Sequence, residues 1–214
     1  MTTNTLAAPT LRTAADMVAI ADTRAGLAAI HRPGCPAAVW YRPTAPAFLS
    51  WLARLPPEHL PRIRVILRPE EVRSAVEAAC AEAGMPAGDP LAAFVEDVVL
   101  LAETFAETMR APYLRCRLDV ITSNACRRFH IDAVTARLIC TYRGSGTQMG
   151  VSTDGGDPSQ IFAVPAGAPL VLRGTRWPEL PPSGLLHRSP PIEGTGETRL
   201  LLVLDPIDDP DSEI

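Results

Sequence analysis

The sequence predicts an α+β fold in which an N-terminal helical layer covers a double-stranded β-helix, or jelly-roll, core. Apolar residues recur at helical spacing across residues 89–109, but from Tyr113 onward they alternate with polar residues at the two-residue period of a strand. Turns rich in glycine and proline then separate a series of short strand candidates. Helices followed by a run of short strands are typical of a sandwich or barrel with a helical cover.

The part of the chain before residue 112 is expected to be mainly helical. Helix 89–109 has the clearest signals, because Asp89 suits the N-cap, Pro90 suits the first helical position and an apolar stripe follows. A second helix at 69–83 is expected to end at Gly84. The other elements expected here are a helix at 13–29, a turn at 31–36, a strand at 37–41, a helix at 46–54 and a strand at 63–67.

The clearest strand spans residues 113–121. Its even positions from Leu114 to Val120 are apolar and its odd positions from Arg115 to Asp119 are charged, so we expect one buried face and one polar face. Further strands are expected at 135–142, 160–164, 170–173, 185–187 and 198–204. The chain is therefore divided, within one structural domain, into an N-terminal extension (1–36), a mainly helical support layer (37–111), a jelly-roll metal-binding core (112–206) and an acidic tail (207–214).

The composition narrows the classes of function. A chain of 214 residues, 47% hydrophobic and with a net charge of −4, is expected to be a globular protein with no electrostatic attraction to nucleic acid or to an anionic membrane surface. All 20 basic residues are arginine, so lysine chemistry is excluded and a bound carboxylate would be held by arginine. Five cysteines without a Cys-x-x-Cys pair, and a start without signal-peptide features, predict a cytoplasmic location.

Three residues have the spacing of a metal site. His130 and Asp132 are two positions apart, so on an extended strand both side chains point to the same face, and His187 follows in a later strand. Two histidines and one carboxylate form the facial triad of non-heme Fe(II) oxygenases. In the alternative interpretation His130 and Asp132 cap turns and His187 is an isolated surface histidine.

Several other residues are candidates around this site. Arg199 could bind the far carboxylate of a 2-oxo acid, or it could lie on the solvent face of its strand. Arg137 and Tyr142 lie on opposite faces of one strand, so at most one of them lines the cavity, and Tyr142 could donate a hydrogen bond to the co-substrate. Arg188 could support His187 or point to solvent, and a Cys126 thiolate would favour zinc.

The segments CRRFHIDAVTARLICTYRGSGTQ, HRSPP and RLLLVLD resemble a bacterial domain-of-unknown-function family, DUF1826, which is often encoded near zinc-homeostasis genes. The resemblance extends from about Ala37 to the end of the last strand. Many members have Gly-Thr-Glu-Trp where this chain has Gly-Thr followed by Gln148 and Met149. The family name implies no established activity.

A wider resemblance is to Fe(II)/2-oxoglutarate-dependent dioxygenases of the prolyl-hydroxylase and phytanoyl-hydroxylase type. It implies Fe(II) bound by His130, Asp132 and His187, with 2-oxoglutarate held by Arg199. Arg199 follows the second histidine at a slightly longer spacing than is usual in those enzymes.

The leading hypothesis is therefore a cytoplasmic mononuclear oxygenase of the Fe(II)/2-oxoglutarate type, acting on a small molecule or protein that the sequence does not identify. The second hypothesis is a zinc-binding protein without redox chemistry that uses the same three ligands and Cys126. The third is a jelly-roll binding module that no longer uses its triad. The sequence does not predict the oligomeric state.

Overall fold

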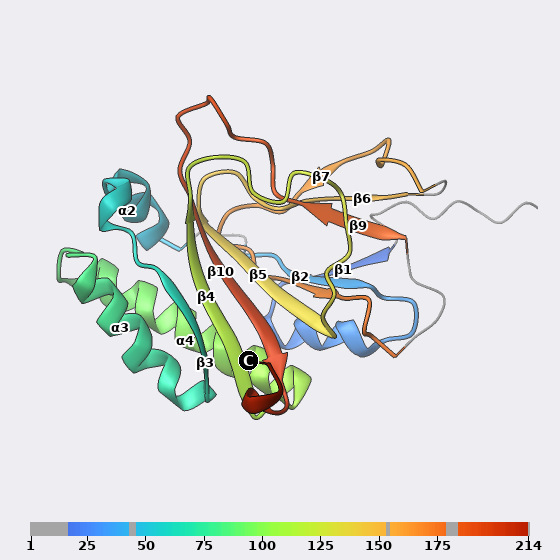
Figure 1. Ribbon diagram of the computed structural model, residues 1–214, viewed down its shortest axis with the longest axis horizontal. Helices are drawn as coiled ribbons and strands as arrows, with labels where there is room; N and C mark the ends of the chain where they lie inside the picture. Colours follow the sequence, from blue (N-terminus) through green and yellow to red (C-terminus); the bar gives the residue numbers. More distant parts are fainter. Residues whose placement is uncertain (1–16, 43–45, 153–154, 179–183, 214) are drawn as a thin grey trace, which may run out of the picture.

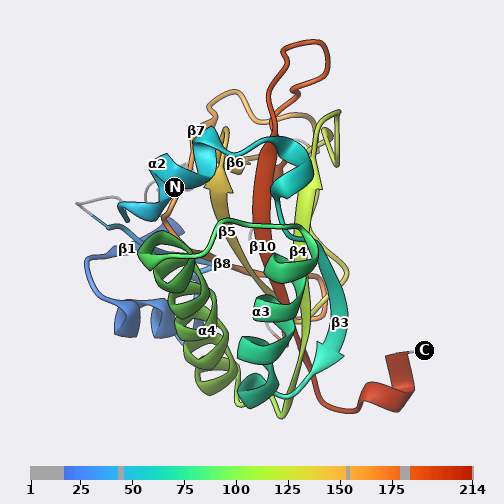
Figure 2. The same cartoon turned by 90° about the vertical axis from the view of Figure 1, so that its left-hand side faces the viewer.

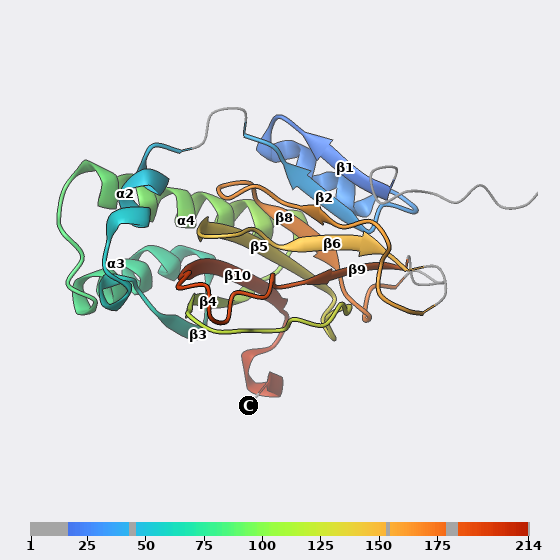
Figure 3. The same ribbon diagram turned by 90° about the horizontal axis from the view of Figure 1, so that it is seen from above.

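The computed structural model describes residues 17–42, 46–152, 155–178 and 184–213, which form two β-sheets and a group of helices (Figure 1). The large sheet is mixed, and its strands lie in the order β1-β2-β8-β5-β10-β4-β3. Only the β1–β2 pair is parallel among these described strands. Their bounds are β1 Val18–Ala21, β2 Ala37–Trp40, β3 Ile63–Leu67, β4 Tyr113–Ile121, β5 Ala136–Arg143, β8 Leu170–Arg173 and β10 Arg199–Ile207. Figure 3 shows β1 and β3 at its opposite edges.

A smaller antiparallel sheet packs against one face of the large one. It consists of β7 (Phe162–Ala163), β6 (Gln148–Val151) and β9 (Leu185–Arg188), in that order. Met149 and Leu185 from the small sheet share one apolar cluster with Ile139, Leu201 and Val203 of the large sheet. The two sheets therefore enclose a core of their own.

The helices lie on the other face of the large sheet (Figure 2). They are α2 (Phe48–Arg54), α3 (Val72–Glu82) and α4 (Asp89–Met109). Short 3-10 helices occur at Arg24–His31, Pro57–His59, Pro69–Glu71 and Pro210–Glu213. Helix α4 spans the predicted residues, although Gly88 is its N-cap and Asp89 lies in the first turn. Phe94 and Phe105 of α4 are fully buried against the sheet.

The predicted alternation in β4 is confirmed. Leu114, Cys116 and Leu118 are buried in the core beneath the helices, and the intervening residues are half-buried. Strand β10 alternates in the same way, since Leu200 faces the helices and Leu201 faces the small sheet. The polar face of β4 therefore faces the space between the two sheets as well as solvent.

The α+β class is confirmed, but the N-terminal region is less helical than predicted. Residues 13–16 lie outside the described residues, and the rest of the expected helix at 13–29 is the strand β1 followed by a 3-10 helix. Strands β1, β2 and β3 join the same sheet as the strands after residue 112. Strands β2 and β3 lie where strands were predicted, and only β1 replaces a predicted helix, because it pairs with β2. The sheet therefore extends into the region that was assigned to the helical layer. No helix among the described residues is long and apolar enough to cross a membrane.

Candidate metal centre

Backbone pairing brings the two predicted histidines together. His130 and His187 form an isolated antiparallel bridge, in which each backbone N–H donates to the other carbonyl at 3.0 Å. Directly opposed residues on neighbouring strands project to the same side, and the two imidazole rings lie 4.5 Å apart between centroids. Residues that are 57 positions apart in sequence thus become neighbours.

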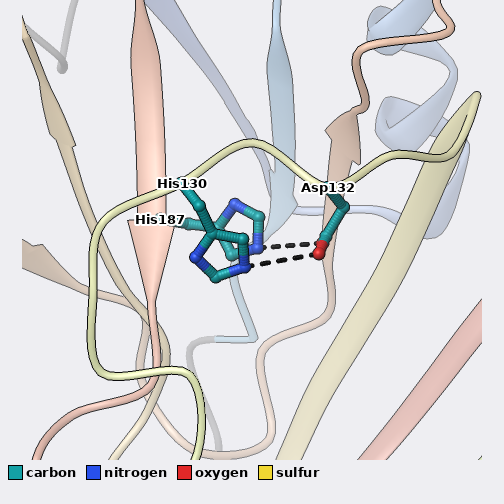
Figure 4. Close-up of side chains that lie close together, drawn as sticks. All are labelled: His130, Asp132 and His187. Carbon is teal, nitrogen blue, oxygen red and sulfur yellow. Dashed lines mark ion pairs between the residues drawn. The ribbon is translucent and has the colours of Figure 1, made fainter. Parts of the chain in front are cut away.

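Asp132 completes the cluster (Figure 4). Its Oδ1 lies 3.3 Å from His130 Nε2 and its Oδ2 lies 3.0 Å from His187 Nε2. Each of the three residues offers one ligand atom within 4.8 Å of the other two. Two imidazole nitrogens and one carboxylate oxygen this close together fit a single transition-metal ion.

The surroundings orient His130 and Asp132. His130 Nδ1 donates to the carbonyl oxygen of Arg128 at 2.8 Å, because that oxygen can only accept. Nε2 therefore faces the cluster, where it donates to Asp132 when the ring is protonated and offers its lone pair to a metal when the ring is neutral. The hydrogen bond with Asp132 raises the pKa of His130. Burial opposes ionisation of Asp132, but its close contacts with His130 and His187 outweigh burial and hold the pKa of this carboxyl well below its usual range.

Arg137 and Asp205 form a second layer behind the carboxylate. Arg137 Nη1 lies 2.7 Å from Asp132 Oδ1. The same guanidinium donates from Nε and Nη2 to the two oxygens of Asp205, at 2.6 and 2.8 Å. Asp205 is 1% exposed. The arrangement fixes the position of Arg137 and, through it, that of Asp132.

A cavity of about 130 Å³ adjoins the triad. Its wall includes Ile139, Leu201 and Val203 from the apolar cluster between the sheets. Charged residues of β4 also line it, namely Arg117 and Asp119. The triad therefore borders a space between the sheets that a small molecule could enter.

Arg199 is wholly buried at the start of β10, on the same face of that strand as the cavity residue Leu201. Its Nε donates to the carbonyl oxygen of Ser145 at 2.7 Å. Its Nη1 and Nη2 are buried and have no hydrogen-bond partner among the described residues. Burial lowers its pKa to about 10. The guanidinium therefore has unused donors that suit a carboxylate.

The other candidates lie in different surroundings. Tyr142 is on the opposite face of β5 and donates to Asp97 Oδ2 at 2.9 Å beneath the helices, so the structure does not bring it to the cavity. Cys126 has an exposed thiol and lines the cavity, but it is not part of the three-residue cluster. Arg188 also lines the cavity, where it donates to Gln148 and stacks on Phe129.

Sequence reasoning missed Asp205 and Arg117. The signal for Asp205 was a single acidic residue in the otherwise apolar run of β10, at an odd position that faces the small sheet. Arg117 was predicted on the polar face of β4, but the alternation in β4 does not indicate that the small sheet partly covers this face.

Comparison with family models matches residues 21–205 to "Protein of unknown function (DUF1826)". No curated protein matches the sequence. Among solved structures, the dioxygenase for auxin oxidation from rice is similar in fold, with a TM-score of 0.50 and 12% identity over 91% of this chain and 83% of that one. A Pseudomonas putida prolyl-4-hydroxylase gives a TM-score of 0.36 and 15% identity, over 76% of this chain and 98% of that one. The rice structure supports the jelly-roll class of the fold.

Proposed function

The chain belongs to the DUF1826 family, and we propose that it is a mononuclear Fe(II)- and 2-oxoglutarate-dependent oxygenase. The observation that carries the proposal is the cluster of His130, Asp132 and His187 beside a cavity. This donor set suits iron and leaves positions on the ion for other ligands. Together with 2-oxoglutarate, a bound Fe(II) would activate dioxygen to oxidise a substrate.

The chain's own residues have distinct tasks in this proposal. His130, Asp132 and His187 hold the metal, and Arg137 keeps the Asp132 carboxylate in place. Arg199 binds the distal carboxylate of 2-oxoglutarate through Nη1 and Nη2, which lack partners among the described residues. The apolar residues between the sheets keep water away from the reacting groups.

We further propose a cytoplasmic setting for the enzyme. All five cysteines are free thiols, and four of them are buried. Free thiols are typical of a reducing compartment.

Anaerobic calorimetric titration tests the proposal. We expect one Fe(II) per chain, and 2-oxoglutarate that binds only when the metal is present. Arg199→Gln should lower the affinity for 2-oxoglutarate by about ten- to a hundredfold, because a buried charged hydrogen bond is lost. The affinity for Fe(II) should not change. Arg64→Gln removes an exposed arginine of β3 and is the matched control.

Two outcomes would contradict the oxygenase. The first is 2-oxoglutarate that has no measurable affinity for the metal-loaded protein. The second is tight zinc binding that is lost in Cys126→Ser, which would favour a zinc protein with a fourth ligand. Retained metal affinity in Cys126→Ser agrees with the three-residue cluster.

A further inference from the structure

We propose that the substrate oxidised at this site carries a carboxylate, and that Arg117 binds it in the cavity beside the triad. The inference rests on the proposed function, which it extends from a reaction type to a class of substrate. It comes from the contacts of Arg117 and from the charges that line the cavity.

Arg117 lies on the cavity wall because of the alternation in β4. Its neighbours at 116 and 118 are buried beneath the helices, so its own side chain projects to the other face. Arg117, Asp119 and Ile121 line the same cavity as the triad. The guanidinium and the candidate metal ligands therefore border one space.

Arg117 makes only long contacts with two carboxylates, and it shares both of them with other arginines. Its nearest acidic oxygens are Asp205 Oδ2 at 3.5 Å and Asp119 Oδ2 at 3.9 Å. Charge-assisted hydrogen bonds are typically about 2.7–2.9 Å long. Both oxygens of Asp205 already accept shorter bonds from Arg137. Asp119 also lies 3.6 Å from Arg64.

Burial makes the length of these contacts costly. The Arg117 side chain is 16% exposed, and its Nε is buried without a partner among the described residues. Burial lowers the pKa of Arg117, and the charge of Asp205 offsets only part of this effect. A desolvated guanidinium without a short contact is stabilised when an anion enters the space in front of it.

The charges of the cavity point in the same direction. Three arginines and two aspartates line it. Asp205 lies behind them as a third acidic group, but both of its oxygens accept short bonds from Arg137 rather than from Arg117. An anionic group on the substrate would give Arg117 a close partner of its own.

A carboxylate suits the site better than a larger anion. The planar fork of arginine matches the two oxygens of a carboxylate. The cavity of about 130 Å³ is smaller than the pockets that enclose whole drug-sized ligands, so it admits a small acid or the acidic end of a longer molecule. Arg199, which lies outside the cavity lining, is left for the co-substrate.

The first test is a methyl NMR titration of the metal-free protein with matched acids and amides: benzoate against benzamide, and hexanoate against hexanamide. We expect each acid to bind at least tenfold more tightly than its amide, and to shift the methyl signals of Ile121 and Val203. Arg117→Gln should abolish this preference. Arg64→Gln should keep it, because Arg64 pairs with Arg117 across β3 and β4 but is largely exposed.

The second test separates the substrate from the co-substrate, using zinc-loaded protein with saturating 2-oxoglutarate. We expect the acids to bind alongside 2-oxoglutarate, and Arg117→Gln to leave 2-oxoglutarate affinity unchanged. If 2-oxoglutarate displaces the acids and loses affinity in Arg117→Gln, Arg117 belongs to the co-substrate and the proposal is wrong. Equal binding of acids and amides, or an acid preference that survives in Arg117→Gln, would also overturn it.

The design keeps the two proposals separate. If the protein binds no metal, the proposed function fails, but the metal-free titration still decides the role of Arg117. If Arg117→Gln does not fold, Arg117→Lys keeps the charge without the fork and should retain only part of the preference. The methyl shifts of the unaltered protein then locate the acid, and shifts confined to residues outside the cavity would contradict the inference.

Discussion

The two faces of the large sheet are built from the same strands but have opposite chemistry. On the helical face, Phe94 and Phe105 of α4 pack against the even residues of β4 and β10. On the other face, apolar residues such as Leu201 and Val203 share the surface with Arg117, Arg137 and Asp205. A strand that alternates residue by residue can thus line an apolar core on one face and a charged cavity on the other.

Both faces hold arginine nitrogens without partners, but the faces differ in what lies beside them. On the helical face, Asp97 accepts from Arg42 at 2.6 Å and from Tyr142 at 2.9 Å, while Nε and Nη2 of Arg42 are buried without a partner among the described residues. On the cavity face, Arg117 has no acidic oxygen closer than 3.5 Å, and two nitrogens of Arg199 have no partner among the described residues. Closely paired charges stabilise a fold, whereas unpaired donors beside a cavity are features of a binding site.

Among variants that separate the roles of the two faces, Asp132→Ala on the cavity face should have the largest effect. This variant removes the carboxylate that lies between His130 and His187, so Fe(II) binding should be lost while cooperative unfolding is kept. The measurement is anaerobic calorimetry with Fe(II). Asp119→Ala removes a carboxylate from the same cavity outside the cluster and should retain the metal. Stoichiometric iron in Asp132→Ala would contradict the triad.

Phe94→Ala should show the reverse pattern. Phe94 is fully buried and contacts the rings of Phe48 and Tyr142 edge-on, so its loss should lower the free energy of unfolding by about 3–5 kcal/mol. Urea denaturation measures this change, and Fe(II) affinity of the folded protein should stay the same. A cost below about 1 kcal/mol would mean that the helical face is not the main stability core.

Asp205→Asn should have an intermediate effect on the metal. Arg137 would lose a bidentate carboxylate partner and hold Asp132 less firmly, so Fe(II) affinity should fall by about ten- to a hundredfold. Competition against a chelator measures the affinity. Asp208→Asn alters a nearby exposed residue and should change nothing. Unchanged affinity in Asp205→Asn would limit Asp205 to a role in folding.

The smallest effect concerns pH and belongs to the helical face. Burial raises the pKa of the Cys80 and Cys116 thiols to about 12, whereas the unfolded chain ionises them from about 9. Their contribution to stability is therefore complete below pH 9 and is lost as the pH rises toward 12. In the presence of a reductant, the unfolding free energy of Cys116→Ala should fall less steeply with rising pH than that of the unaltered protein. Cys126→Ala should not, because that thiol is exposed in the folded protein.

Local patterns predicted a large part of the fold. Helix α4 and strand β4 were correct because their apolar spacing is long and regular. The helix predicted at 13–29 was wrong for Val18–Ala21, which form β1, because a short segment rich in alanine carries little periodicity and pairing with β2 decided its conformation. Residue parity correctly predicted that Arg137 and Tyr142 lie on opposite faces of β5. It did not predict which of these faces borders a cavity.

The sequence by itself determined the α+β class, the helical and strand periodicities and the residue types that suit a metal site. Only the tertiary structure decided that His130 and His187 pair across a bridge, that Asp205 lies behind Arg137, and that Tyr142 faces the helices. The physical reason is that periodicity depends on neighbours along the chain. The distances between the candidate metal ligands depend instead on strand pairing across tens of residues and on how the sheets pack.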